Sequence, residues 1–319
     1  MDLVLDVDTG VDDALALLLA VRHPELTVRA VTCVRGNASL DQVVRNTLNV
    51  LDAAGAPDLP VAAGARRPLI AEPHDAGHVH GKDGLADLGL PDPARRPDPR
   101  HAVELLRDVV TAAEDRLTLV ALAPLTNVAL FVRTYPDLAR QLARIVVMGG
   151  SAGVGNASPV AEFNTWHDPE AAAIVLDAGV PVTMYGLDVF YQPAVDSIGR
   201  EKLAAAGNPA ADLATRLLQH ALGNGEPRVP AGGAPLGDAG AVCSLLHPDG
   251  LVTGRFPVHV ELAPGRTRGQ TVVDRRAQPG EQEIHGLAGT GAPLVDVALE
   301  VDGPGYGRLF VDTLLGVTG

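Results

Sequence analysis

The sequence has little cysteine, few aromatic residues and a deficit of basic residues. Its 319 residues include only two cysteines, Cys33 and Cys243, so a disulfide framework and a cysteine-based zinc site are excluded. Aromatic residues make up 3% of the chain, and 25 Lys and Arg stand against 39 Asp and Glu, which gives a formal net charge of −14. An acidic field of that size repels polyanions and argues against nucleic acid and anionic membranes as partners.

Long apolar runs are also missing. No run of about 18 uncharged apolar residues occurs, and Asp2, Asp6 and Asp8 lie where a signal peptide would be apolar. We therefore expect a cytoplasmic protein without a membrane span. Apolar residues nonetheless account for 46% of the chain, which favours a large folded core over disorder. No stretch has the composition of a domain boundary, and we expect one domain over residues 1–319.

Short apolar runs alternate with segments of helical periodicity along most of the chain. Strands are predicted at residues 3–5, 27–33, 117–122, 145–148 and 182–187, and helices at 11–21, 40–54, from 125 onward and at 169–178. Strands that alternate with helices in this way form βαβ units. The sequence therefore predicts an α/β fold, an open, mostly parallel, doubly wound (Rossmann-like) sheet with helices on both faces. Ligands of such sheets bind beyond the carboxyl ends of the strands.

The remaining segments complete the expected fold. Residues 258–262 and 270–273 predict a peripheral hairpin, and a final helix is expected near 308–316. The Pro- and Gly-rich stretches 88–99 and 222–240 are predicted as long surface loops. Loops of that length often serve as lids or binding loops.

The most informative segment is the acidic run at residues 6–14, Asp-Val-Asp-Thr-Gly-Val-Asp-Asp-Ala. It places four carboxylates at the end of a strand and the start of the following helix, where they repel one another unless a cation neutralises them. An all-oxygen cluster suits Ca²⁺ or Mg²⁺ and not zinc or copper. Helix capping and dipole complementation would account for Asp12 and Asp13, but not for all four acids.

The same run also resembles the motif of the aspartate-nucleophile (haloacid dehalogenase-like) phosphatases. In that interpretation Asp6 is the nucleophile and Asp8 is the acid/base. Asp12 and Asp13 follow too closely to serve as the distal acidic motif of those phosphatases, and no matching lysine segment is found. The phosphatase hypothesis is therefore the weaker alternative.

Amide and carboxylate side chains recur at the ends of the later strands. Asn37 follows the second strand, Asn127 follows the strand that ends at residue 122, and Asn156, Glu162 and Asn164 follow the next one. Each asparagine alone is typical of a turn. Because these strand ends meet at one sheet edge, the set predicts a polyol-binding site, where sugar hydroxyls find paired donors and acceptors.

Taken together, these motifs resemble the inosine–uridine preferring nucleoside hydrolase family. The matching stretches cover the chain almost end to end in the family's order: residues 6–14, 36–37, 79–85, 124–127, 148–150, 161–164, 168–172, 186–189 and 267–274. The resemblance implies one open α/β domain, a tightly held Ca²⁺, and hydrolysis of the N-glycosidic bond of a ribonucleoside to ribose and free base. It also implies a homodimer or a homotetramer.

Carried over residue by residue, the resemblance implies a role for each member of the site. Ca²⁺ would be held by Asp8, Asp13, the backbone carbonyl of Leu122 and Asp238, and Asp8 would also accept the proton of the attacking water. Asp12 would bond the ribose 2′-hydroxyl, and the remaining hydroxyls would be bound by Asn37, Asn156, Glu162 and Asn164. Asp6 would support the site. The chemistry is consistent, because breaking a C–N glycosidic bond builds positive charge on the sugar that surrounding carboxylates stabilise.

The sequence departs from the family pattern at one position. The family's His-Asp pair at the last metal ligand corresponds here to Gly237 and Asp238, so the side chain that would protonate the departing base is missing. A positioned acid contributes about 10²- to 10⁴-fold in rate. Three explanations stay open. Another side chain donates the proton, the leaving base is already cationic and needs none, or the protein has lost efficient catalysis.

Candidates for the missing proton donor can be named. His80 comes first, because the family places its loop over the site, and His220 and Tyr191 follow. Trp166 or Tyr185 would be able to stack on a base. The expected partner is a small-molecule nucleoside, and the non-enzyme alternative is a nucleoside- or ribose-binding pseudoenzyme that keeps the metal site.

Overall fold

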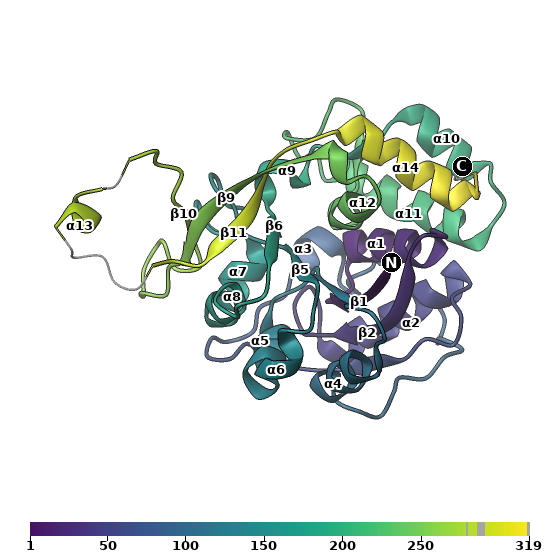
Figure 1. Cartoon of the computed structure of the whole chain (residues 1–319). Helices are drawn as coiled ribbons and strands as arrows, with labels where there is room; N and C mark the ends of the chain where they lie inside the picture. Colours follow the sequence, from purple (N-terminus) through teal and green to yellow (C-terminus); the bar gives the residue numbers. More distant parts are fainter. Residues whose placement is uncertain (279, 286–290, 318–319) are drawn as a thin grey trace.

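A nine-stranded sheet forms the centre of the computed structural model, which describes residues 1–278, 280–285 and 291–317 (Figure 1). Its strands are β1 (Asp2–Val7), β2 (Thr27–Cys33), β3 (Val61–Ala63), β4 (Thr118–Ala121), β5 (Arg144–Met148), β6 (Val182–Tyr185), β9 (Leu251–Val260), β10 (Thr271–Val273) and β11 (Leu294–Val301). Their order is β10-β9-β11-β6-β5-β4-β1-β2-β3. From β3 to β11 neighbouring strands are parallel, and β9 is antiparallel to both β11 and β10. Two short strands, β7 (Ala194–Val195) and β8 (Ala234–Pro235), pair separately.

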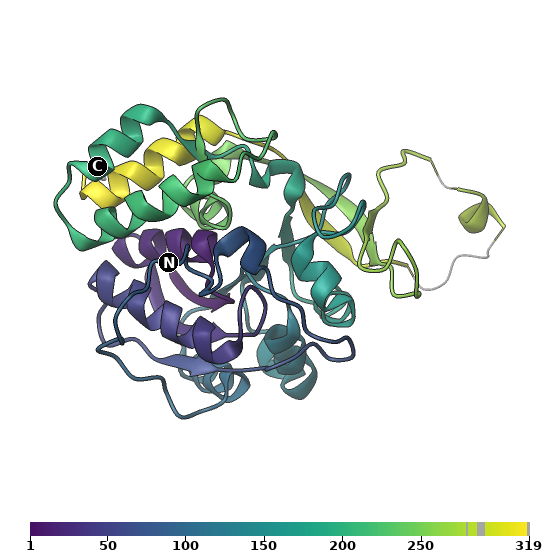
Figure 2. The same cartoon turned by 180° about the vertical axis from the view of Figure 1, so that it is seen from behind.

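Helices cover both faces of this sheet (Figures 1 and 2). One layer contains α1 (Val11–Arg22), α2 (Leu40–Ala54), α11 (Pro209–Gly223), α12 (Ala239–Leu246) and α14 (Gly303–Leu315), and the other contains α4 (Ala102–Ala112), α5 (Thr126–Thr134) and α8 (Pro169–Leu176). The shorter helices are α3 (Gly77–His80), α6 (Pro136–Ala139), α7 (Phe163–His167), α9 (Leu187–Phe190), α10 (Ser197–Ala204), α13 (Glu281–Ile284) and a 3₁₀ turn at Pro248–Gly250. None of the helices in the described ranges combines the length and the apolar character that a bilayer span requires.

The sheet separates two apolar cores. Leu3 and Leu5 of β1 belong to the core under α1, whereas Val4 belongs to the core under α5. Successive residues of a strand point to opposite faces, so a strand covered on both sides is apolar at every position. This explains why β1 reads as a continuous apolar run.

The strand order reverses beside β1. The chain moves outward from β1 to β2 and β3, and then returns to place β4 on the other side of β1. Helices that follow β1 and β4 therefore leave toward opposite faces, which opens a crevice at the carboxyl ends of these two strands. The acidic run of residues 6–14 begins at this crevice.

The predicted α/β fold class is confirmed, and most predicted elements agree with the structure to within a few residues. The strand at 27–33 and the helix at 40–54 have the predicted bounds, whereas the strand expected at 182–187 stops at Tyr185 because Leu187 begins α9. The predicted peripheral hairpin is confirmed, because β10 and β9 are the two outermost strands at one edge of the sheet, but β9 is longer than predicted and also pairs with β11. β11 was not predicted, and the final helix starts earlier than expected, at Gly303.

Candidate active site

A cavity of about 790 Å³ opens at the carboxyl ends of β1 and β4. Its wall contains most of the predicted site residues: Asp8, Asp12, Asn37, His80, Leu122, Asn156, Glu162, Asn164, Trp166 and Asp238. Asp13 is fully buried next to it and is hydrogen-bonded to Asn37. Segments far apart in the sequence therefore converge on one cavity, as the parallel strand ends predict.

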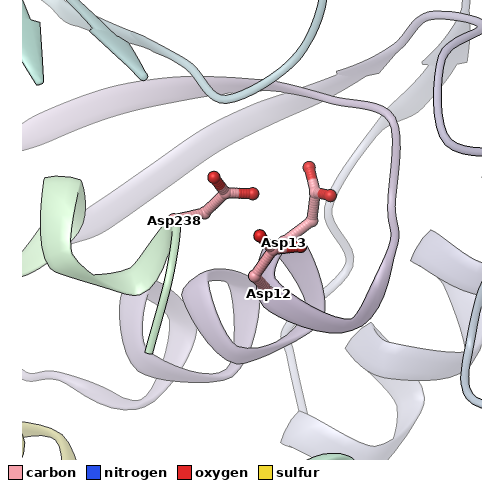
Figure 3. A group of neighbouring side chains, drawn as sticks. All are labelled: Asp12, Asp13 and Asp238. Carbon is pink, nitrogen blue, oxygen red and sulfur yellow. The ribbon is translucent and has the colours of Figure 1, made fainter. Parts of the chain in front are cut away.

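Three carboxylates meet at the base of the cavity (Figure 3). One oxygen from each of Asp12, Asp13 and Asp238 lies within 4.8 Å of the other two. Asp12 and Asp13 belong to the first turn of α1, and Asp238 immediately precedes α12. The structure thus brings Asp12, which was predicted for the ribose, into this close group, while Asp8, a predicted metal ligand, lies outside it.

Backbone amides hold Asp8 and Asp13 in place. The Asn37 N–H donates to Asp8 Oδ2 at 2.7 Å, and the Asp8 and Gly10 N–H groups donate to the Asp13 carboxylate at 3.2 and 2.9 Å. A Cβ at Gly36 would lie 1.9 Å from Asp8 Oδ2, so only glycine lets the backbone approach this carboxylate. Asp13 also caps α1 through its bond to Gly10.

The electrostatics of these acids favour a bound cation. Burial, together with the negative charge of Asp12, raises the pKa of Asp13 to about 7. Burial and neighbouring carboxylates also raise the pKa values of Asp8 and Asp238, and Asp12 Oδ1 is buried without a hydrogen-bond partner. A hard divalent cation would remove this repulsion, and carboxylate and carbonyl oxygens are the ligands that Ca²⁺ and Mg²⁺ prefer. The residues present therefore fit such an ion.

Asp6 supports the site from behind. It is fully buried, and its Oδ1 accepts hydrogen bonds from Thr32 Oγ1 at 2.6 Å and from Asn127 Nδ2 at 2.8 Å. Its backbone carbonyl accepts from the Leu122 N–H at 2.8 Å, so it fixes the residue whose carbonyl was predicted to bind the metal. Asn127, predicted among the polyol-binding side chains, is fully buried in this network and absent from the cavity wall.

Two predicted sugar-binding residues are anchored by main-chain contacts. Asn164 Nδ2 donates to the carbonyls of Leu122 and Met148, both at 3.1 Å. Because these bonds occupy the amide nitrogen, the side-chain oxygen Oδ1 is left as an acceptor for a ligand. Glu162 caps α7 and accepts from the N–H groups of Asn164 and Gly150 at 2.8 and 3.0 Å. Burial raises the pKa of Glu162 to about 7.

The other two amides differ in exposure. Asn37 is buried, and its Nδ2 donates to Asp13 Oδ2 at 3.3 Å. Asn156 is exposed at the mouth of the cavity, and its Oδ1 accepts a hydrogen bond from the Phe163 N–H at 2.9 Å. Asn37 is therefore tied to the acids, whereas Asn156 is tied to the aromatic side of the mouth.

Of the two candidate stacking residues, one lines the cavity. The ring of Trp166 lies in the wall with its centroid 5.0 Å from that of His74. Tyr185 is fully buried beside Gly240 and absent from the wall. The prediction that Tyr185 could stack on a base is therefore wrong.

His80 ends α3 and reaches the cavity with 9% of its surface exposed. The Val11 N–H donates to His80 Nδ1 at 3.1 Å, so the ring proton belongs on Nε2. Burial lowers the pKa of His80, which leaves a neutral imidazole that donates through Nε2. His220, the second candidate, is absent from the wall, and its Nε2 lies 2.8 Å from the carbonyl of Val79.

Comparison with known proteins supplies the family. The family model described as inosine-uridine preferring nucleoside hydrolase matches residues 3–307. The chain belongs to that family. It is therefore an enzyme that hydrolyses nucleosides, and the phosphatase alternative is wrong, in agreement with the burial of Asp6.

Individual relatives match this chain over nearly its full length. A pyrimidine-specific ribonucleoside hydrolase, RihA, from Enterobacter sp. (strain 638) is 39% identical over 315 residues, which are 98% of this chain and 97% of that one. A plant nucleoside hydrolase, PpNRh1, superimposes with a TM-score of 0.88 at 28% identity, with 98% of each chain covered. A purine-preferring ribonucleoside hydrolase from Gardnerella vaginalis gives 0.87 at 29% identity, with 99% of each chain covered.

Gly237 lies two residues before the start of α12, in the cavity wall beside the acids at its base. Its φ is +56°, and a Cβ there would lie 2.6 Å from Asp12 Cβ and 3.1 Å from Phe190 Cζ. Left-handed backbone and lack of space both favour glycine at this position. The hydrolase therefore has no room for a histidine here with this backbone.

Sequence reasoning missed one side of the mouth. Asn224, Glu226 and Arg228 line the cavity from the predicted 222–240 loop, and the Arg228 guanidinium lies 4.0 Å from the ring centroid of Tyr191. Their only signal was membership of that loop, which was named as a possible lid. The 88–99 loop contributes nothing to the wall among the described residues.

Proposed function

We propose that this enzyme is a Ca²⁺-dependent N-ribohydrolase that converts pyrimidine ribonucleosides to ribose and free base. The buried acids Asp8, Asp13 and Asp238 carry the proposal, because carboxylates crowded together out of water repel one another and a bound cation relieves that repulsion. The pyrimidine preference is supported by 39% identity to the pyrimidine-specific RihA, against 29% to the purine-preferring enzyme from Gardnerella vaginalis.

The ion would be held by Asp8, Asp13, the Leu122 carbonyl and Asp238, next to Asp12. When bound, it supplies a Lewis acid that lowers the pKa of the attacking water. Ca²⁺ suits a set of carboxylate and carbonyl oxygens on separate segments better than Mg²⁺, which demands near-ideal octahedral geometry.

The side chains of the cavity would perform the remaining steps. Asp8 accepts the proton of the attacking water, and Asp12, Asn37 and Asn164 bind the ribose hydroxyls, together with Asn156 and Glu162. The negative charge around the ring stabilises the positive charge that develops on the sugar as the C–N bond breaks. A buried acidic site therefore favours the transition state over the neutral substrate.

His80 would contact the departing base as a neutral hydrogen-bond donor through Nε2. The Val11 N–H on Nδ1 fixes this tautomer, and burial opposes protonation of the ring. His80 therefore stabilises charge on the base without delivering a full proton from an imidazolium, and Trp166 contributes an apolar wall.

The direct test is release of free ribose from uridine, cytidine, inosine, adenosine, guanosine and nicotinamide riboside, with and without a calcium chelator. We expect uridine and cytidine to be hydrolysed fastest, chelation to abolish release, and added Ca²⁺ to restore it. Release that survives chelation would refute the calcium requirement, and release from purine ribosides alone would refute the pyrimidine preference. Tight nucleoside binding with no release from any riboside would refute the proposal as a whole.

We also propose that the enzyme acts in the cytoplasm as a homodimer or homotetramer. Light scattering of the purified protein measures the mass of the assembly, and a monomer across the working concentration range would contradict this expectation.

A further inference from the structure

Arg228 is the one lysine or arginine found among the described residues of the cavity wall. Its Nε and Nη2 donate to the Glu226 carboxylate at 2.8 and 3.1 Å, and its guanidinium lies over the Tyr191 ring. Within the described part of the chain, Nη1 has no hydrogen-bond partner. One edge of the guanidinium is therefore held by an acid and one face by a ring, while the remaining N–H groups stay available to a ligand.

The cavity poses a chemical problem that this cation can solve. A pyrimidine that leaves without a proton carries a full negative charge, and a neutral active site stabilises it poorly. Gly237 offers no side chain, burial holds His80 in its neutral form, and burial raises the pKa of Tyr191. Arg228 remains positively charged throughout, since its pKa is raised by hydrogen bonding to Glu226.

We propose that Arg228 is a catalytic residue that stabilises the departing base as an anion, in place of the missing acid. This inference rests on the proposed function. The C1′–N bond breaks with its electron pair moving to the base nitrogen, while the water oxygen bonds to C1′ and its proton passes to Asp8. The base leaves as an anion held by Nη1 of Arg228 and takes a proton from solvent after release.

The placement also selects among leaving groups. A guanidinium N–H matches a base with a carbonyl oxygen beside the glycosidic nitrogen, as in uracil and cytosine, because negative charge delocalises onto that oxygen. A base that is already cationic, such as nicotinamide, is repelled by the same group. Of the three explanations for Gly237, the position of Arg228 thus favours a substitute group in the wall over a cationic substrate.

The test compares leaving groups of different intrinsic ability. Wild type, Arg228→Gln and Arg228→Lys are assayed for kcat and KM on uridine and on p-nitrophenyl β-D-riboside, whose phenolate leaves easily without help. We expect Arg228→Gln to lower kcat on uridine by about 10²-fold and to change the p-nitrophenyl riboside by less than about 5-fold, with partial recovery in Arg228→Lys. Arg216→Gln, on the exposed side of α11 and outside the wall, is the matched control and should behave as wild type.

The outcomes separate this inference from the function beneath it. A wild-type enzyme that is inactive on all ribosides refutes the proposed function, and this inference with it. An active wild type whose Arg228→Gln variant loses the same factor on both substrates, or changes only KM, overturns the inference alone. So does a wild type that prefers nicotinamide riboside to uridine. If thermal denaturation shows that Arg228→Gln is unfolded, Arg228→Lys is assayed in its place. Its kcat should then fall by a smaller factor, and the fall must again be confined to uridine.

Discussion

The floor and the rim of the cavity differ in burial, in the elements that form them and in charge. The floor, comprising Asp8, Asp12, Asp13, Glu162 and Asp238, lies at strand and helix ends, and apart from Asp12 its members are at most 3% exposed. The rim, comprising His74, Val79, Asn224, Glu226 and Arg228, comes from the segment that contains α3 and from the loop after α11, and most of its members are exposed. The floor concentrates charge of one sign, whereas the rim pairs Glu226 with Arg228.

Under the proposed function, the floor carries out the reaction and the rim selects among the bases. Backbone hydrogen bonds fix the floor, so its geometry follows from the fold. Under that function this geometry serves the ribose, which all ribonucleosides share. The rim lies mostly in loops, and loops tolerate substitution better than strand ends. The relatives agree, because one is named pyrimidine-specific and another purine-preferring although both match this fold over nearly the whole chain. Changes in the floor should therefore affect all substrates alike, and changes in the rim should affect them unequally.

The largest expected effect comes from Asp13→Asn in the floor. The substitution removes one charge with little change in shape, so Ca²⁺ loses a ligand and kcat/KM should fall at least about 10³-fold on every ribonucleoside. Ribose release and calorimetric titration with Ca²⁺ measure the two losses. Asp249→Asn, at an exposed acid, should be neutral, and a loss confined to one base would contradict the division between floor and rim.

Gly237 joins the two regions and should show an intermediate effect. Alanine there meets Asp12 at 2.6 Å with φ at +56°, so we expect a cost of about 1 to 3 kcal/mol and a roughly 10-fold lower kcat/KM. Gly237→His should be worse and should not restore a proton donor. Gly232→Ala is the matched control, because its φ is +73° with nothing within 4 Å of the added Cβ, and it should lose stability but keep activity. A higher rate in Gly237→His would show that the loop can accommodate the family histidine.

Local signals in the sequence were sufficient for Asp8, Asp12 and Asp13 of the floor, whereas the roles of Glu162 and Asp238 came from the family resemblance. Four acids within residues 6–14 predict a cation site, and the spacing of the apolar residues around them predicts β1, α1, β2 and α2. The elements that were missed lack such signals. β9 contains Gly254 and Pro257, and most of its residues are half-buried or exposed, so neither alternation nor a continuous apolar run marks it.

The rim was missed for a different reason. Arg228 lies in a Pro- and Gly-rich loop without periodicity, and its importance arises from contacts with Tyr191, 37 positions earlier in the chain, and with Glu226. Contacts of this kind form only when the loop folds over α9, which no local pattern encodes. Asn127 shows the reverse error, since a polar residue after a strand was predicted for the ligand and instead bonds Asp6.

The smallest expected effect is a pH dependence of stability that belongs to the floor and to Asp6 behind it. In the folded protein burial raises the pKa values of Asp6, Asp13 and Glu162 to about 7, well above their unfolded values near 4. Such groups favour folding while protonated, and this stability is lost as pH rises through about 7. Buried His80 and His167 act in the opposite direction, but their pKa values are lowered, so they lose stability only as pH falls below about 6.5.

Between pH 6.5 and 8 the acids therefore dominate. The metal-free enzyme should lose on the order of 1 kcal/mol per group, seen as a melting temperature lower by a few degrees at pH 8. Saturating Ca²⁺ should reduce this slope by the share of Asp13, because the ion stabilises the ionised form of a carboxylate that holds it. Glu162→Gln should flatten the slope of the metal-free protein by its own share, whereas Arg228→Gln at the rim should leave it unchanged. A metal-free enzyme that becomes more stable from pH 6.5 to 8 would mean that the floor acids are already ionised and compensated without a cation.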